Sequence, residues 1–160
     1  MTLPLTPPTP SPLTPRHLAD TVRSFAARPE SWRPRVRFTT SRRWYQRLEV
    51  TEDHEVWLLT WLPGQGTEIH DHGGSSGSFS VVQGTLTERA FGPGGGTRER
   101  SLGPGAVRAF GPEYIHQVVN ELTAPAVSIH AYSPVLSRQS YFAQTPDGGL
   151  RLLRTEVVED

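Results

Sequence analysis

Apolar and polar residues alternate over short stretches from Arg43 onward, and turns rich in Gly and Pro separate these stretches. Such a pattern is typical of β-strands rather than helices. Strands are predicted over 44–50, 55–62, 67–72, 78–83, 86–91, 98–102, 106–110, 115–120 and 126–132, with 139–143 and 150–158 as further candidates. About ten short, closely spaced strands predict an all-β fold built as a small sandwich or barrel.

The only helical periodicity lies before these strands. Leu18, Val22 and Phe25 recur at helical spacing, and Thr14 followed by Pro15 is typical of a helix start, so a helix is predicted over 15–27. Residues 1–13 are rich in Pro and are expected to form a flexible arm. We therefore expect a single domain over 14–160, all-β with a small α part at its N-terminus.

Composition excludes several classes of function. The formal net charge is zero, so no basic surface for nucleic acid or an anionic membrane is expected. The absence of Cys excludes disulfides and thiolate metal ligands. No apolar run is long enough to span a membrane, and no signal peptide is recognised at the N-terminus. We expect a cytoplasmic, monomeric protein without nucleic-acid or membrane partners.

The candidate chemistry begins at His70 and His72, which one residue separates. Two such side chains project from the same face of a strand, because strand side chains alternate between faces. His116, from a later predicted strand, would complete a three-point metal cradle. Three neutral imidazoles leave a divalent metal its full charge, which favours an anionic ligand such as a thiolate. The same ligands could hold Zn²⁺ with an activated water, so they do not identify the metal.

The surrounding residues resemble the two motifs of the cupin superfamily. Glycines at 64, 77 and 84 frame the His pair, and Gly105 and Asn120 frame His116. Gly77 stands where cupins usually carry a metal-binding Glu, which is a departure from the motif. The resemblance implies a cupin β-barrel or jelly-roll sandwich.

A second polar set follows at Ser128, His130 and Tyr132, with alternate spacing on one strand. Their side chains share a face and can form a hydrogen-bonded relay that ends at the Tyr oxygen. Followed by Ser133-Pro134, and behind a His pair that lacks the Glu, this segment resembles the thiol dioxygenases of the cysteine dioxygenase type.

The resemblance implies a role for each matching residue. His70, His72 and His116 match the Fe(II) ligands of the family, whereas Ser128, His130 and Tyr132 match its outer catalytic triad. Gly77 matches a Cys that mammalian members cross-link to the Tyr, so the Tyr here must be unmodified. The resemblance also leads us to expect a cis peptide at Ser133–Pro134.

The segment Tyr45-Gln46-Arg47 matches the substrate-binding Tyr-x-Arg of the family. Arg47 would bind the substrate carboxylate beside Tyr45, since a guanidinium binds a carboxylate through two hydrogen bonds. Trp44 and Leu48 are apolar and lie on the same face of the strand as Gln46, which would place Gln46 inward instead. The pattern leaves open whether Arg47 or Gln46 faces the pocket. A bulge near Glu49 could reconcile the two patterns.

The resemblance implies an Fe(II)-dependent enzyme that oxidises L-cysteine with O₂ to cysteine sulfinic acid. Another thiol carboxylate, such as 3-mercaptopropionate, is an alternative substrate. A Zn-type cupin, or a cupin that binds a small molecule without catalysis, are alternatives of other classes. The expected partners are therefore a small-molecule thiol and O₂.

Overall fold

The structure is a computed structural model that describes residues 12–158 except 94–95. It has one α-helix, α1 (Pro15–Ala26), followed by 3₁₀ turns at Pro29–Ser31 and Arg33–Arg35. The strands are β1 (Tyr45–Val50), β2 (Glu55–Trp61), β3 (Ile69–His70), β4 (Ser76–Gln83), β5 (Leu86–Phe91), β6 (Thr97–Leu102), β7 (Val107–Phe110), β8 (Ile115–Val119), β9 (Ala126–Ser133), β10 (Arg138–Gln144) and β11 (Leu150–Val157). The predicted all-β fold with one N-terminal helix is confirmed. Nearly all of the predicted arm lies outside the described residues.

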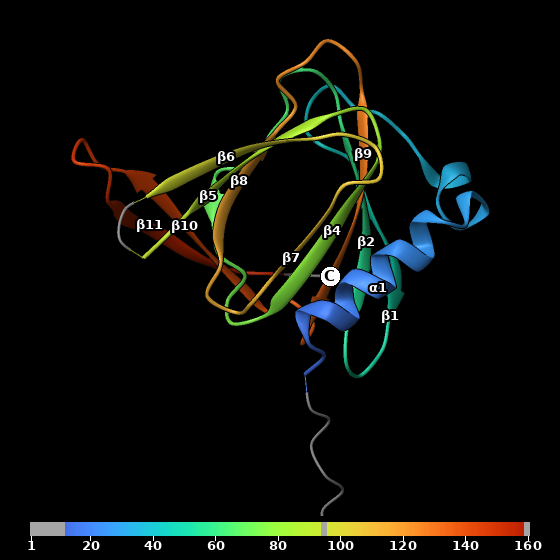
Figure 1. The fold of residues 1–160 in the computed structure, drawn as a ribbon, viewed down its shortest axis with the longest axis horizontal. Coiled ribbons are helices and arrows are strands. Elements are labelled where there is room, and N and C mark those ends of the chain that lie inside the picture. The colour runs from blue at the N-terminus through green and yellow to red at the C-terminus, as the bar shows by residue number, and fades with distance from the viewer. Residues whose placement is uncertain (1–11, 94–95, 159–160) are drawn as a thin grey trace, which may run out of the picture.

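Two antiparallel sheets face each other in this fold (Figure 1). One has the order β1-β2-β9-β4-β7 and the other β11-β10-β3-β8-β5-β6. Helix α1 lies across the outer face of the five-stranded sheet (Figure 1). Its side chain at Thr14 accepts a hydrogen bond from the backbone N–H of His17, which caps the helix as its sequence predicts.

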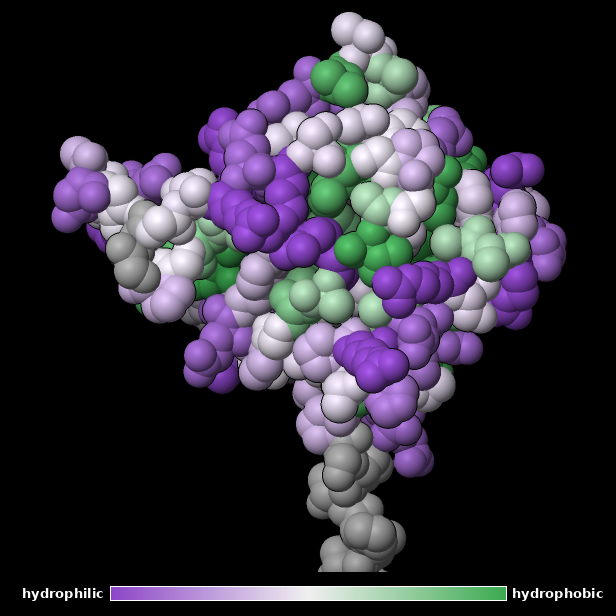
Figure 2. All heavy atoms as spheres, in the orientation of Figure 1, coloured by the Kyte–Doolittle hydropathy of each residue, from purple (hydrophilic) through white to green (hydrophobic). Residues whose placement is uncertain are grey.

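The hydrophobic core has two layers because the five-stranded sheet is covered on both faces. Between the sheets lie Trp61, Phe79, Val81, Leu86, Leu102, Phe110, Val118, Ala126 and Tyr132. Between the sheet and α1 lie Leu18, Val22, Trp32, Val56, Leu58, Val127, Ile129 and Ala131. Figure 2 shows hydrophobic side chains in the space between the sheets and hydrophilic ones over β5 and β6.

Strand β9 is covered on both faces, and this cover determines where its polar side chains point. All eight of its residues are buried. Val127, Ile129 and Ala131 belong to the layer under α1. The alternate residues, including His130 and Tyr132, therefore point between the sheets. Apolar packing on one face thus fixes the polar set on the other.

The predicted strand over 67–72 is wrong in length, because β3 contains only Ile69 and His70. Asp71 ends the strand: its Oδ1 accepts hydrogen bonds from the backbone N–H groups of Gly73 and Ser140, at 3.1 and 2.8 Å. Gly73 and Gly74 then turn the chain with φ of 59° and 96°. His72 is therefore positioned by a turn, and strand alternation alone does not explain why it lies near His70.

Candidate metal centre

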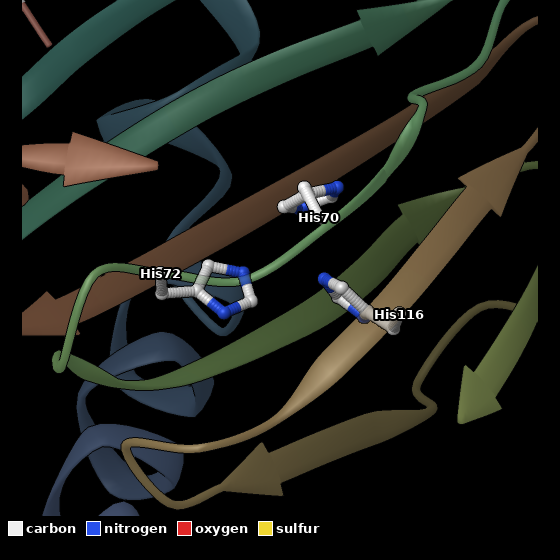
Figure 3. A group of neighbouring side chains, drawn as sticks. All are labelled: His70, His72 and His116. Atoms are coloured by element: carbon white, nitrogen blue, oxygen red, sulfur yellow. The ribbon is translucent and has the colours of Figure 1, made fainter. Parts of the chain in front are cut away.

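His70, His72 and His116 converge between the two sheets, and all three are buried (Figure 3). One ring nitrogen from each lies within 4.8 Å of the others. His70 pairs directly with His116 across β3 and β8, and the turn after β3 brings in His72. The sequence spacing thus leads to a compact cluster of three imidazoles.

Backbone and side-chain acceptors set the tautomers of two of these rings. His70 Nδ1 lies 2.8 Å from the carbonyl oxygen of Glu68, and His116 Nδ1 lies 2.9 Å from Glu88 Oε2. A carbonyl and a carboxylate only accept hydrogen bonds, so both Nδ1 atoms carry the proton. The lone pair of each ring is then on Nε2, where it could bind a metal.

His72 provides the test of whether the cluster fits a metal ion. Both of its ring nitrogens are buried without a hydrogen-bond partner among the described residues. Leaving a polar atom in this state is costly unless a further ligand is bound. Burial, followed by the nearby His116 and His70, lowers the pKa of His72 well below its ordinary value. A neutral imidazole with an unpartnered nitrogen is what a divalent metal requires.

Glu88 is a functional candidate that the sequence analysis missed. Its carboxylate is fully buried, and it accepts hydrogen bonds from His116 and from Arg108 Nε at 3.0 Å. Arg100 Nη1 lies 3.7 Å away from the same carboxylate. Glu88 lies two residues after Leu86 in the same predicted strand, so alternation places both side chains on the buried face. A charged residue on that face was the signal available in the sequence. Such a carboxylate orients a metal-binding His and raises its basicity.

Ser128, His130 and Tyr132 form a connected set beside the cluster. His130 Nε2 lies 2.7 Å from Ser128 Oγ, and His130 Nδ1 lies 3.4 Å from the Tyr132 hydroxyl. The set extends to Trp61, whose indole N–H donates to Ser128 Oγ at 2.8 Å. Trp61 was not singled out from the sequence, because its partner lies 67 residues away and leaves no local signal.

These contacts determine where the protons lie. Burial, then the charge of Arg43, lowers the pKa of His130 to about 3, so the ring is neutral. Trp61 donates to Ser128, so the Ser hydroxyl can donate to His130 Nε2 and the ring proton then lies on Nδ1. Burial raises the pKa of Tyr132, which keeps its hydroxyl protonated. The phenol accepts from His130 and can donate its own proton onward.

A cavity of about 510 Å³ opens beside both groups. Two of the cluster residues, His70 and His116, line it together with His130 and Tyr132. Tyr132 also stacks on His72, with ring centroids 5.4 Å apart. The cavity therefore reaches two of the three imidazoles together with His130 and Tyr132.

The two predicted substrate-binding residues differ in their position. Tyr45 lines the cavity, as does Arg43, which the sequence analysis did not consider. Arg47 faces the same side of the strand as Tyr45, but among the described residues it is not part of the cavity lining. Its guanidinium instead lies 3.9 Å from the buried Glu55 carboxylate.

The register of β1 resolves the conflict that its sequence pattern raised. A bulge between Arg47 and Glu49 interrupts the pairing with β2, near the position considered from the sequence. Trp44 and Leu48 pack into the layer under α1, which explains their alternation with Gln46. These apolar residues therefore mark the side of β1 that faces the α1 layer, and Tyr45 marks the cavity side.

Comparison with known proteins agrees with this geometry. The family described as cysteine dioxygenase type I matches residues 16–145. The chain belongs to this family. It is 31% identical over 128 residues to cysteine dioxygenase type 1 of Danio rerio, which covers 69% of this chain. It spans about 61% of the length of that relative.

Solved structures support the cupin fold of this family member. A protein with a double-stranded β-helix domain from Klebsiella pneumoniae is 18% identical with a TM-score of 0.55, covering 74% of this chain and 90% of its own. A cupin superfamily protein from Desulfitobacterium hafniense is 11% identical with a TM-score of 0.54, covering 64% and 87%. At these identities the likeness shows the fold alone. No helix among the described residues is long and apolar enough to cross a membrane.

Proposed function

We propose that the protein is an Fe(II)-dependent thiol dioxygenase and that L-cysteine is its substrate. His70, His72 and His116 are the iron ligands, and Ser128, His130 and Tyr132 are the outer catalytic set. The reaction converts R–SH and O₂ to R–SO₂H, so both oxygen atoms enter the product and the sulfur loses four electrons. No other oxidant or reductant is needed.

The observation that carries this proposal is the meeting of two polar groups in one cavity. His70 and His116 line the wall beside Tyr132, whose ring stacks on His72. Iron, when bound, supplies the site at which a thiolate and O₂ can react. The three ligands are neutral, so the charge of the metal remains available to attract the thiolate.

The remaining residues act on the bound substrate through hydrogen bonds and positioning. Tyr132 accepts a hydrogen bond from His130 and presents its own O–H to a ligand in the cavity. His130 is held in turn by Ser128 and by stacking on Phe79, with ring centroids 5.0 Å apart. Fixed donors of this kind lower the barrier because they need no reorganisation during the reaction.

Oxygen uptake across a thiol panel tests the proposal. The protein is loaded with Fe(II) without air, and O₂ consumption and sulfinate formation are measured with L-cysteine, 3-mercaptopropionate and cysteamine. We expect one O₂ consumed for each sulfinate formed, with L-cysteine preferred. The His70→Ala variant is expected to lose stoichiometric iron and all turnover.

The same panel separates the alternatives. Faster turnover of 3-mercaptopropionate would reassign the substrate within the same reaction class. Absence of O₂ uptake with every thiol, in protein shown to contain iron, would refute the proposed activity. Purified protein that retains Zn²⁺ and rejects iron would indicate the Zn-type alternative.

A further inference from the structure

Strand β11 is the terminal strand of the six-stranded sheet, and no strand among the described residues pairs with its outer edge. Figure 1 shows it in a hairpin with β10 at one side of the molecule. Seven of its eight residues are exposed, and they include the apolar side chains of Leu152, Leu153 and Val157. A long strand edge with exposed apolar side chains is a surface to which a further strand can be added.

The sequence of β11 is complementary to itself in the antiparallel direction. Residues 152–158 read Leu-Leu-Arg-Thr-Glu-Val-Val, with Thr155 at the centre. When two copies pair antiparallel with their Thr155 residues opposite each other, Arg154 lies opposite Glu156 of the partner subunit. Val157 then lies opposite Leu153 of the partner subunit. Oppositely charged, apolar and Thr–Thr pairs all stabilise antiparallel strands.

Other registers of the same strand lack this complementarity. A pairing centred on Arg154 places two guanidinium groups opposite each other, and one centred on Glu156 opposes two carboxylates. Like charges directly opposite each other destabilise a strand pair. Strand β6, at the other end of the sheet, would oppose two copies of Glu99, and Arg98 to Arg100, if it were centred on Glu99. Self-complementarity is therefore a property of β11 and not of edge strands in general.

The backbone of β11 also suits this register. The N–H of Val158 donates to the carbonyl oxygen of Ser137 across the hairpin, at 3.0 Å. The bulge of the hairpin lies beside Leu153 and leaves residues 154–157 in regular pairing with β10. Because backbone groups alternate in direction along a strand, the N–H and C=O of Thr155 point away from β10. At the centre of the register, two copies of Thr155 can therefore exchange both hydrogen bonds.

The charged pair at this edge is already ordered within one copy. Arg154 Nε donates to Glu156 Oε1 at 2.8 Å, and its guanidinium also pairs with Glu68. Its Cζ lies 4.3 Å from the ring centroid of Tyr141, which fixes it further. Association through β11 would place a second carboxylate opposite each Arg154, so the interface buries no charge without a counter-charge. Arg154 and Glu156 also line the cavity, so the same strand forms a wall of the candidate site.

We propose that two copies of the chain associate through their β11 strands into a symmetric dimer with Thr155 at the two-fold axis. The two six-stranded sheets then join into one continuous sheet, and the two cavities lie on either side of the axis. This dimer goes beyond the proposed function and differs from the monomer expected from the sequence. Strand addition forms a small interface, so we expect a Kd in the micromolar range.

Sedimentation velocity of the full chain, from low micromolar to near-millimolar concentration, measures the association. The parent protein is expected to change from monomer to dimer over this range. Thr155→Pro removes an outward N–H and no hydrogen bond to β10, which an edge strand tolerates. It should raise the Kd at least about 10-fold, because the central pair of hydrogen bonds is lost. Arg98→Glu, on the β6 edge, is the matched control and should dimerise as the parent does.

A pair of charge variants tests the register itself. Arg154→Glu has carboxylates at both positions of the charged pair, and Glu156→Arg has guanidinium groups at both. Each variant alone should remain monomeric, because like charges face each other across the interface. An equal mixture of the two should associate, because each variant then meets the opposite charge. Recovery in the mixture shows that both variants are folded.

Hydrogen exchange identifies the strand that is covered. The amide of Thr155 should exchange more slowly at high than at low protein concentration, since only the dimer gives it a hydrogen-bond acceptor. A parent protein that stays monomeric at the highest concentration overturns the proposal, including the case in which a strand of a different protein occupies this edge. A parent dimer that Thr155→Pro does not weaken, or charge variants that fail to associate when mixed, would also overturn it.

Discussion

The ring of Phe110 occupies the space that a side chain at Gly77 would need. A Cβ built on Gly77 would lie 2.4 Å from Phe110 Cζ and 3.0 Å from Tyr132 Cδ1. Phe110 also packs on His72, with ring centroids 4.7 Å apart. At the position that the resemblance matches to the Cys of mammalian members, this protein therefore has room only for an aromatic ring that packs on a candidate metal ligand.

Gly77→Ala is expected to destabilise the fold. The added methyl group must displace Phe110 or Tyr132, and overpacking of this kind costs about 1–3 kcal/mol. Urea denaturation of parent and variant measures the change in the free energy of unfolding. Gly111→Ala is the control, because a Cβ there meets no atom within 4 Å. Equal stability of the two variants would show that Phe110 moves aside without cost.

Glu88→Gln is expected to weaken metal binding while the protein stays folded. The amide has one accepting oxygen, so it cannot accept from both His116 and Arg108 as the carboxylate does. Loss of such an outer partner typically costs 10–100-fold in metal affinity, and we expect roughly that change. Competition with a chelator measures the affinity. Glu99→Gln, on an exposed pair with Arg89, should bind metal as the parent does.

Tyr132→Phe is expected to keep the iron and lower kcat by roughly 10–100-fold, the scale of losing an outer-shell partner. The hydroxyl that contacts His130 is removed, while the ring that stacks on His72 remains. Steady-state oxygen uptake measures kcat, and metal analysis checks the iron content.

His130→Ala should lower kcat in the same direction. The factor by which kcat falls in the double variant should be far smaller than the product of the two single-variant factors, because the two residues act as one unit. Single effects that multiply in the double variant would argue against a relay through His130.

The metal-free protein is expected to lose stability as the pH falls. Burial, with the charge of Arg43, lowers the pKa of His130 to about 3, below the value of about 6.5 expected in the unfolded chain. Between these values the unfolded chain binds the proton and the folded protein does not, so acid favours unfolding. His70, His72 and His116 shift in the same direction through burial.

Urea denaturation at a series of pH values from about 7.5 to about 5 tests this, with a slope of up to ~1.4 kcal/mol per pH unit for each such group. His130→Gln should reduce the slope, because one buried imidazole is removed. A free energy of unfolding that does not change over this range would contradict the expectation.

Much of the fold was predictable from local pattern. Alternation and turn residues placed strands such as 86–91 and 55–62 within one residue of the observed β5 and β2. The helix was placed well too, because Thr14 and Pro15 form its start by contacts within one turn. The cis peptide at Ser133–Pro134, expected from the family resemblance, is confirmed.

The sequence by itself also determined which polar residues could act together within one segment. Ser128, His130 and Tyr132 share a face because alternation along a strand is a local property of the backbone. The family resemblance likewise depended on motifs that can be read in order along the chain.

Only the tertiary structure decided the contacts that join distant segments. Trp61 reaches Ser128, and Glu88 reaches His116, across neighbouring strands whose register no local pattern specifies. The alternation of Trp44 and Leu48 was ambiguous because α1 covers the outer face of the sheet, so apolar residues are buried on both sides. For the same reason, sequence alone did not distinguish Arg43 from Arg47. The pairing of Arg47 with Glu55 depends on the register between β1 and β2.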